Sequence, residues 1–456
     1  MYDVVIVGGG PGGYAAALYA HNFGLSVALV EKDTVGGTCL LRGCIPAKAW
    51  LQAAEVYTTV AKAGEFGVEV GKPEFNWTTA LERKQKIVDG LVTGLGGLLK
   101  SRNVDIVDGF GRLASPNLVA VDTAEGERLL EARHIVLATG SVPRSIPGYD
   151  FDGDRIVSSD HALDWESRPE RVGIIGAGAI GCEFASLLTD LGSDVHVFEM
   201  LDQIVPGADS KAAAELQKQL KRRGVKFHLG ASVGPAEVGK KAVQVPLGDE
   251  RVEVDVVLVA VGRAPLTDGI GLEASTIEVD RGYVIVDPLT QLTAEPTIYA
   301  VGDIVAGVPQ LAHAGFAEAI AAITHIATGQ TAPVDYRAIP LVVYTHPEMA
   351  EVGMTEARAK EAGIDVEVHV HSMIGVGRAQ IIGQNQGLVK VVNRKDGPII
   401  GASVVGPQAG EMIHELMYAV GWEALPAEAA AFIHAHPTLS EAVGETLLAS
   451  AGRSLH

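Results

Sequence analysis

Two cysteines five positions apart carry the clearest chemistry in this chain of 456 residues. Cys39 and Cys44 stand in residues 36–48, which read GGTCLLRGCIPAK and follow a glycine-rich turn, GGGPGG, at residues 8–13. A thiol pair beside such a turn indicates a redox-active disulfide next to a hydride carrier. A structural disulfide and two inert buried thiols are the alternatives, although stable disulfides are rare in the cytosol. The third cysteine, Cys182, lies in an apolar stretch and is interpreted as a small buried hydrophobe.

The spacing of this pair requires a break in the local structure. Five residues of a regular helix rise about 7.5 Å and turn through about 500°, so the two sulfurs would point apart. A disulfide needs its Cα atoms roughly 4.4–6.8 Å apart. Gly43 and Pro46 can distort the segment, because Pro46 has no N–H for the carbonyl of Arg42. A thiol near the start of a helix, with Lys48 close by, is also expected to be acidic.

An internal repeat provides the frame around these thiols. Residues 3–7 form an apolar run that leads into the glycines at 8–13, an alanine-rich helical segment and a second strand at 26–31. The same order recurs from residue 172, with glycines at 176–181 and a second strand at 194–199. The chain is therefore expected to contain two βαβ units of the same kind.

Each copy has GxGxxG at its first turn and a glutamate at the end of its second strand, Glu31 or Glu199, 23 positions after the first glycine. This fingerprint predicts two dinucleotide sites in which a helix N-terminus holds the diphosphate; an ordinary strand-to-helix turn is the alternative. In order, the glycines serve the tight turn, the close approach of the backbone to a pyrophosphate, and the packing of helix on strand. They are Gly8, Gly10 and Gly13 in the first copy and Gly176, Gly178 and Gly181 in the second.

Further strands and Pro/Gly clusters set the expected domain organisation. Strands are predicted at 134–138, 256–261 and 297–301, and they lead into Thr139-Gly140, Gly262-Arg263-Ala264-Pro265 and Gly302-Asp303. The fold class is α/β, with two Rossmann-like dinucleotide-binding domains and a C-terminal α+β domain. The predicted segments are 1–143 (first dinucleotide domain), 144–264 (second dinucleotide domain), 265–336 (return to the first domain) and 337–456 (C-terminal domain).

Composition excludes several classes of protein. The net charge of −20, without a basic stripe, argues against nucleic acid as a partner. No apolar run reaches the length of about 18 residues that a membrane span needs. A strand at residues 3–7 leaves no room for a signal or transit peptide before the fold. We therefore expect a soluble cytoplasmic protein with neither nucleic-acid nor membrane partners, and no metal site is predicted.

With these motifs in hand, the chain resembles the class I pyridine nucleotide–disulfide oxidoreductases, and among them the dihydrolipoyl dehydrogenases, over essentially its whole length. The resemblance rests on the paired fingerprints and on GGTC-x4-CIPxK at 36–48, ATG at 138–140, YAVGD at 299–303 and HAHPTLSE at 434–441. It implies oxidation of protein-bound dihydrolipoamide to lipoamide. Electrons would pass through the Cys39–Cys44 disulfide and FAD to NAD+.

The resemblance also implies which residues bind the two cofactors. For FAD these are Gly8, Gly10, Gly13, Glu31, Gly37, Thr38, Lys48, Gly111, Thr139, Gly140, Asp303 and Ala312. For NAD they are Gly176, Gly178, Gly181, Glu183, Glu199, Val233 and Gly262. Glu31 would contact the adenosine ribose and Asp303 the ribityl chain of the flavin. Lys48 would lie near the flavin ring, paired with Glu183.

The C-terminal motif supplies acid–base chemistry. Dihydrolipoamide must lose a proton before its sulfur can attack a disulfide, and imidazole titrates in the right range. By resemblance, His436 is this base and Glu441 orients it. The spacing from Thr438 to Glu441 also fits a capping box, in which Glu441 would have a structural role at a helix start. We interpret His434 as structural.

The resemblance further implies a homodimer, because the C-terminal domain of one subunit reaches the disulfide of the other. The expected partners are lipoyl domains and the core or peripheral-subunit-binding domain of a 2-oxo acid dehydrogenase complex, with the glycine cleavage carrier protein as a further candidate. The chain departs from the family pattern at Leu41-Arg42, which replaces Asn-Val, at Ala47, which replaces Ser, and at Leu266, which replaces Asn. Arg42 places a cation in the redox loop, where it could tune thiolate stability or disulfide potential.

Glu199 favours NAD over NADP. Its carboxylate can accept hydrogen bonds from ribose hydroxyls but would repel a 2′-phosphate, and no arginine follows it in residues 200–202.

Three other functions fit the sequence less well. An NAD(P)H-dependent reductase of a low-molecular-weight disulfide would normally have an arginine pair after this strand, and a mercuric reductase would have a C-terminal cysteine pair, which residues 451–456 lack. A non-catalytic flavin-binding assembly subunit would need neither the thiol pair nor His436.

Overall fold

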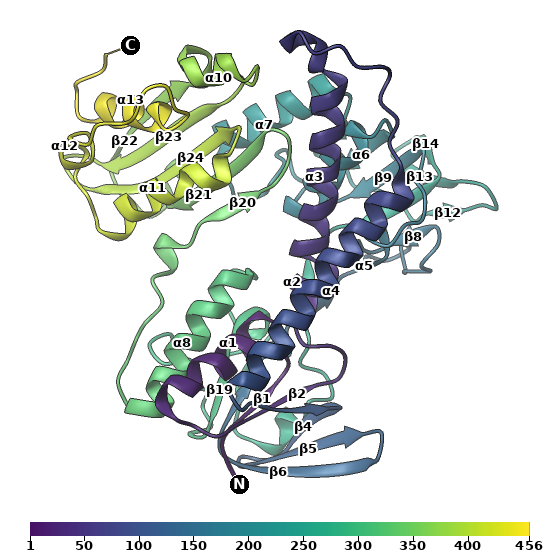
Figure 1. The fold of residues 1–456 in the computed structure, drawn as a ribbon, viewed down its shortest axis with the longest axis vertical. Coiled ribbons are helices and arrows are strands. Elements are labelled where there is room, and N and C mark those ends of the chain that lie inside the picture. Colours follow the sequence, from purple (N-terminus) through teal and green to yellow (C-terminus); the bar gives the residue numbers. More distant parts are fainter. Residues whose placement is uncertain (456) are drawn as a thin grey trace. The chain divides into compact units, whose positions relative to one another are not determined.

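The computed structural model describes residues 1–455 (Figure 1). These residues form two compact units, each assembled from separate stretches of the sequence. The first unit contains residues 1–49, 81–143 and 263–334, and the second contains residues 50–80, 144–262 and the chain from 335 onward. The finer division into four domain segments stays a prediction.

A parallel sheet forms the centre of the first unit. Its elements are β1 (Tyr2–Val7), β2 (Val27–Glu31), β3 (Asp105–Asp108), β4 (Phe110–Ser115), β5 (Leu118–Thr123), β6 (Gly126–Leu137), β19 (Ile298–Ala300), α1 (Pro11–Ala20) and α8 (Ala312–Thr328). The parallel order is β3-β2-β1-β6-β19, and β4 and β5 extend β6 as an antiparallel meander. In β1, Val4 and Ile6 pack with α1 and α8, whereas Val5 and Val7 pack with the meander. Both faces are covered, which explains the unbroken apolar run of this strand.

The second unit repeats this plan around the second fingerprint. Its elements are β8 (Ile156–Val157), β9 (Arg171–Ile175), β10 (Asp194–Phe198), β11 (Lys226–His228), β12 (Glu237–Val238), β13 (Val243–Leu247), β14 (Glu250–Val254), β15 (Val256–Val259), α6 (Ala179–Asp190) and α7 (Ser210–Arg223). The parallel order is β11-β10-β9-β15-β8, with β12, β13 and β14 as an antiparallel meander. In each unit the strand before the fingerprint turn, β1 or β9, is central in the sheet. The strand beside it leads to the glutamate: β2 ends at Glu31, and β10 ends just before Glu199. The predicted pair of Rossmann-like sheets is confirmed.

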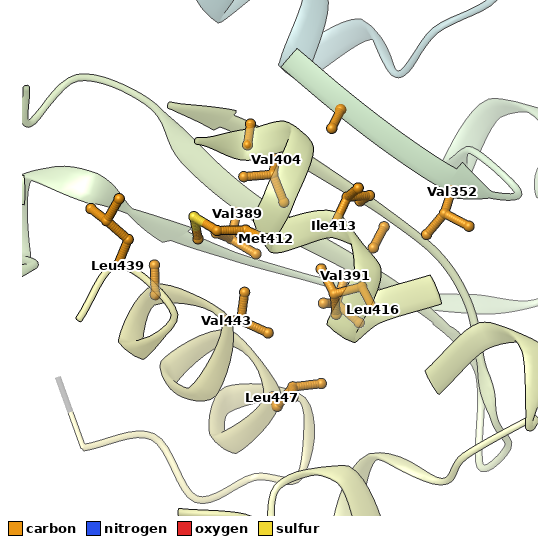
Figure 2. Close-up of a cluster of buried hydrophobic side chains, with 14 of the residues drawn as sticks. Val352, Val389, Val391, Val404, Met412, Ile413, Leu416, Leu439, Val443 and Leu447 are labelled. Atoms are coloured by element: carbon orange, nitrogen blue, oxygen red, sulfur yellow. The ribbon is translucent and has the colours of Figure 1, made fainter. Parts of the chain in front are cut away.

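The C-terminal part of the second unit is an antiparallel sheet with helices. Its elements are β20 (Leu341–Val343), β21 (Glu348–Gly353), β22 (Val366–Ser372), β23 (Leu388–Arg394), β24 (Ile399–Gly406), α11 (Ala409–Gly421) and α13 (Glu441–Ser450). The order is β20-β21-β24-β23-β22. Figure 2 shows Met412 and Leu416 of α11 and Val443 of α13 gathered around Val391 and Val404 of the central strands. This is the expected α+β domain, and its core holds α13, whose first turn carries Glu441.

The remaining helices and strands are short or connect these parts. They are α2 (Gly37–Arg42), α3 (Cys44–Ala61), α4 (Trp77–Ser101), α5 (Ser159–Ala162), α9 (Glu356–Glu361), α10 (Gly377–Ile381), α12 (Pro426–Ala429), β7 (Ser141–Pro143), β16 (Arg263–Pro265), β17 (Val279–Asp280) and β18 (Tyr283–Val284). The strand predicted at 134–138 is the end of the longer β6, whose first half pairs with β5. Among residues 1–455, no helix has the length and apolar character of a membrane span.

Candidate active site

The redox segment folds as two helices with a break between the cysteines. α2 ends at Arg42 and α3 begins at Cys44, and Gly43 between them has φ −146° and ψ −114°. A Cβ on Gly43 would lie 2.8 Å from the carbonyl oxygen of Thr38, so only glycine fits this junction. The predicted distortion is therefore found at Gly43. Pro46 lies in the first turn of α3, where a helix requires no backbone N–H from it, so it starts this helix without bending it.

The break brings the two cysteine side chains together. Cys39 lies on α2 and Cys44 is the first residue of α3. A hydrogen bond with Cys44, together with burial, raises the pKa of Cys39 well above its usual value, while Lys48 acts in the opposite direction. Cys44 is exposed at a helix N-terminus, where the helix dipole favours a thiolate. The two thiols therefore differ in their surroundings: Cys39 is partly buried and hydrogen-bonded to Cys44, whereas Cys44 is exposed at the start of a helix.

The redox segment is docked directly on the first fingerprint turn. The N–H of Gly36 donates to the carbonyl of Gly9 at 2.8 Å. A Cβ on Gly37, which has φ +58°, would lie 2.5 Å from the Cα of Gly10. Gly37 is thus required by a backbone-to-backbone contact, and Gly36 is favoured by its φ of +123°. This contact fixes the thiols next to the predicted dinucleotide site.

The two fingerprints have the same geometry. Gly8 and Gly176 have φ +108° and +98°, values that favour glycine. A Cβ on the third glycine, Gly13 or Gly181, would lie 1.8 or 2.0 Å from the carbonyl oxygen of the first. Helix and strand therefore approach as closely in one copy as in the other.

Both turns leave room for a diphosphate. The second glycine, Gly10 or Gly178, is the N-cap of α1 or α6. A Cβ on Gly10 would have its nearest neighbour at 3.8 Å, and one on Gly178 would have none within 4 Å. The first backbone N–H groups of each helix are therefore accessible to an anion, and the residues present fit a dinucleotide.

The two glutamates make matching hydrogen bonds. Glu31 accepts from the N–H of Gly9 at 2.7 Å and from the N–H two residues after itself at 2.9 Å. Glu199 accepts from the N–H of Ala177 at 2.8 Å and from the N–H two residues after itself at 3.0 Å. Each carboxylate is thus fixed by its own fingerprint turn, with lone pairs left for ribose hydroxyls.

Asp303 belongs to a hydrogen-bonded chain that reaches the redox helix. Ser141 donates its hydroxyl to Asp303 at 2.5 Å, and Arg263 donates to the same hydroxyl oxygen at 2.7 Å. A second nitrogen of Arg263 donates to the carbonyl of Ser141 at 2.7 Å and to the hydroxyl of Thr38 at 3.3 Å. The chain connects the predicted ribityl ligand with the residue next to Cys39.

The acid–base residues of the C-terminal motif also form a pair. Nδ1 of His436 lies 2.7 Å from Oε1 of Glu441, and the His436 side chain is 78% exposed. The other carboxylate oxygen of Glu441 accepts from the N–H of Thr438 at 2.9 Å. Burial alone would raise the pKa of Glu441, but the Thr438 N–H and the His436 ring outweigh it and lower that pKa.

Of the two hydrogen bonds of a capping box, only the one from the Thr438 N–H to Glu441 is present. α13 begins at Glu441 and its N-cap is Ser440, so Thr438 lies outside the helix. The Thr438 hydroxyl donates to the carbonyl of Ala435 at 2.7 Å and does not cap α13. Glu441 therefore holds the loop backbone and the imidazole at the same time.

Sequence comparison decides the family. A model described as "Pyridine nucleotide-disulphide oxidoreductase" matches residues 2–319. Its companion, "Pyridine nucleotide-disulphide oxidoreductase, dimerisation domain", matches residues 339–447. The chain belongs to this family.

Full-length relatives support the assignment. The chain is 39% identical over 471 residues to a dihydrolipoyl dehydrogenase of Bacillus subtilis, covering 100% of this chain and 99% of the relative. It is 40% identical over 459 residues to dihydrolipoyl dehydrogenase 3 of Pseudomonas putida, with 98% and 97% covered. Among solved structures, LpdA of Mycobacterium tuberculosis superposes with a TM-score of 0.90 at 28% identity, covering 97% of this chain and 98% of the other.

The other residues predicted at the FAD site belong to the same unit. Thr139 donates its hydroxyl to the carbonyl of Leu266 at 2.6 Å. Gly111 lies on β4, where a Cβ would lie 2.9 Å from a Val30 methyl group. Gly140 has φ +76°, and Ala312 is the first residue of α8. Sequence reasoning missed Ser141 and Arg263, which link Asp303 to Thr38, although both stand in motifs already singled out, after Thr139-Gly140 and Gly262.

The residues predicted at the NAD site lie in the second unit. Val233 forms an isolated antiparallel bridge with Leu247, and Gly262 has φ +106°. Glu183 on α6 is buried and accepts from the N–H of Tyr344 at 3.0 Å. The partner predicted for Glu183, Lys48, belongs to the first unit, and this pairing stays a prediction.

His434 has a partner of its own. Its Nε2 pairs with the carboxylate of Glu415 on α11, which raises the pKa of His434. The ring also lies against Gly444, where a Cβ would be 2.6 Å from Nδ1. His434 therefore joins the loop to α11 and α13, whereas His436 stands exposed.

Proposed function

We propose that this protein oxidises protein-bound dihydrolipoamide to lipoamide and passes two electrons through the Cys39–Cys44 pair and FAD to NAD+. This is the activity of a dihydrolipoyl dehydrogenase, and FAD and NAD are its cofactors. The observation that carries the proposal is the hydrogen-bonded thiol pair docked on the first fingerprint turn. A protein that only bound a flavin would need neither this pair nor the His436–Glu441 dyad.

The chain's own residues perform the thiol chemistry. His436 removes the proton of the incoming thiol, whose sulfur then bonds to Cys39 while the Cys39–Cys44 bond breaks. Cys44 leaves as a thiolate at the N-terminus of α3, where the helix dipole stabilises it. The second substrate sulfur displaces Cys39, which releases lipoamide and leaves the dithiol. A flavin held beside the thiols would supply the route by which the dithiol gives its electron pair to NAD+ as a hydride, with the Cys39–Cys44 bond formed again and one proton released.

We assign the first fingerprint to FAD and the second to NAD. The thiol pair lies against the first, which supports the flavin there. Glu31 would hold the adenosine ribose of FAD and Asp303 its ribityl chain, while Glu199 would hold the ribose hydroxyls of NAD. Lys48 would lie near the flavin ring.

The dimerisation-domain match over residues 339–447 supports a homodimer. The exposed His436 fits a base that serves the cysteine pair of the partner subunit.

As partners we propose lipoyl domains and the core or peripheral-subunit-binding domain of a 2-oxo acid dehydrogenase complex, with the glycine cleavage carrier protein as a further candidate. The proposed location is the cytoplasm.

A two-by-two substrate test examines this function. The purified protein, reconstituted with FAD, is assayed with lipoamide and with glutathione disulfide, each with NADH and with NADPH. Of the four combinations, we expect rapid turnover only with lipoamide and NADH. In the proposed direction, we expect dihydrolipoamide to be oxidised with NAD+. The Cys44→Ser variant serves as the control for disulfide chemistry. Preference for glutathione disulfide and NADPH, or a protein that does not bind FAD, would contradict the proposal.

A further inference from the structure

Arg42, a departure from the family pattern, lies between the two cysteines and forms an ion pair. It is the last residue of α2, and its guanidinium contacts the carboxylate of Asp33. The backbone N–H of Asp33 donates to Oε1 of Glu31 at 2.9 Å. A continuous path therefore runs from the C-terminal end of the redox helix to the carboxylate proposed to bind the FAD ribose.

The N-terminal end of the same helix reaches the same carboxylate. Gly36, which precedes α2, donates its N–H to the carbonyl of Gly9 at 2.8 Å. Gly9 in turn donates its own N–H to Oε2 of Glu31 at 2.7 Å. The two oxygens of Glu31 are thus connected to opposite ends of α2, and Cys39 lies on the helix between them.

We infer that Arg42 and Asp33 form a tether that couples FAD binding at Glu31 to the position of the redox helix. The inference rests on the proposed FAD site and adds to it a positioning role for Arg42. A ribose bound to Glu31 immobilises both anchors of α2, so the thiols are held in place when the cofactor is bound. By reciprocity, a helix released at Arg42 holds the cofactor less firmly.

The geometry favours a tether over a purely electrostatic role. Asp33 neutralises the guanidinium of Arg42, so the charge is directed at the loop after β2. The cation that lowers the pKa of Cys39 is Lys48. The side chains of Arg42 and Asp33 are 42% and 49% exposed, and an ion pair of this kind contributes modestly. We therefore expect small changes in FAD release and in α2 exchange, of similar size when either partner or both partners of the ion pair are replaced.

The test compares Arg42→Met, Asp33→Asn and the double variant with the wild-type holoenzyme. The rate of FAD release after dilution is followed by flavin fluorescence, and amide exchange is measured for the peptide that contains α2. We expect each single variant to release FAD about two- to fivefold faster and to exchange faster in α2, and the double variant to match the singles. The matched control is Arg128→Met, which removes a similarly exposed ion pair with Asp105 in the same unit.

Other outcomes overturn the tether. Unchanged FAD release and α2 exchange in both single variants would refute it. A purely electrostatic role would shift the dithiol potential in opposite directions, upward for Asp33→Asn and downward for Arg42→Met, and would also refute it. A wild-type protein that binds no FAD would instead refute the proposed function, so the two failures are distinguishable.

Discussion

Nδ1 of His436 and Oε1 of Glu441 lie 2.7 Å apart, and the same carboxylate holds the N–H of Thr438 with its other oxygen. Glu441 therefore fixes the imidazole and the loop that carries it with a single side chain. With Nδ1–H donated to the carboxylate, Nε2 is the basic nitrogen left for a substrate thiol. An exposed histidine prepared in this way is suited to remove a proton from a sulfur that arrives from outside the chain.

Replacement of His436 by alanine should abolish most dihydrolipoamide oxidation. Loss of a general base typically costs about 10²–10⁴-fold in rate. The Glu441→Gln variant should lose less, because the imidazole itself is kept, although the single amide oxygen can accept from the Thr438 N–H or from Nδ1–H of His436 but not from both. Steady-state kcat/KM with dihydrolipoamide and NAD+ measures both effects, and the FAD absorbance shows that the sites are otherwise intact.

The control for this prediction is His414, an exposed histidine on α11 of the same domain. The His414→Ala variant should retain wild-type activity. If His436→Ala were as active as His414→Ala, another group would have to be the base.

The sequence predicted the parts of the site that follow from local backbone geometry. The glycines of both fingerprints and the break at Gly43 could be expected because each involves a turn or a contact between neighbouring segments. The Arg263–Ser141–Asp303 chain could not be predicted in this way. It joins residues more than one hundred positions apart, and no periodicity records which side chains meet after folding.

The double role of Glu441 shows the same limit. The spacing from Thr438 to Glu441 suggested either a capping box or a catalytic dyad. The structure shows the dyad contact together with one half of the box, because α13 begins at Glu441 and Thr438 lies before the helix. The start of the helix, which sequence patterns place only within a few residues, determines which hydrogen bonds form.

Glu199 should make the enzyme selective for NAD over NADP. Both of its oxygens are held by backbone N–H groups, those of Ala177 and Leu201, so the carboxylate cannot easily swing away from a 2′-phosphate. We expect kcat/KM with NAD to exceed that with NADP by orders of magnitude. Glu199→Ala should narrow the gap mainly by weakening the use of NAD. Comparable wild-type efficiency with the two nucleotides would show that Glu199 does not determine the choice.

Glu351 should make the stability of the second unit depend on pH. This residue of β21 accepts from the N–H of Asp209 at 2.8 Å and from the hydroxyl of Ser403 at 3.1 Å, yet burial raises the pKa of Glu351 to about 7. The folded chain then binds more protons at this site than the unfolded chain, whose glutamate titrates near 4.5. Its stabilising contribution is full below about pH 4.5 and is lost as the pH rises through about 7.

The variant Glu351→Gln isolates this effect. The glutamine side chain keeps an oxygen for both donors and cannot ionise. The free energy of unfolding of the variant should therefore exceed that of wild type by more at pH 8 than at pH 5. Glu356 is the matched control, because its pKa is shifted in the opposite direction. Its contacts with Lys360 and Lys390 lower the pKa of Glu356 to about 2. Glu356→Gln should therefore be destabilised at both pH values. Urea unfolding of the holoenzyme measures each difference, and a pH-independent gain for Glu351→Gln would contradict the assignment.

If the base of one subunit serves the thiols of the other, two inactive variants should restore activity when mixed. Cys44→Ser removes a redox thiol and His436→Ala removes a base, so either homodimer lacks a working site. A heterodimer of the two pairs the intact thiols of the His436→Ala chain with the intact His436 of the Cys44→Ser chain, while its second site carries both lesions. The heterodimer, isolated after the subunits are mixed by partial unfolding and refolding and verified by mass, should have about half the specific activity of wild type, since one site of its two is intact. Heterodimers without any activity would mean that each subunit uses its own base.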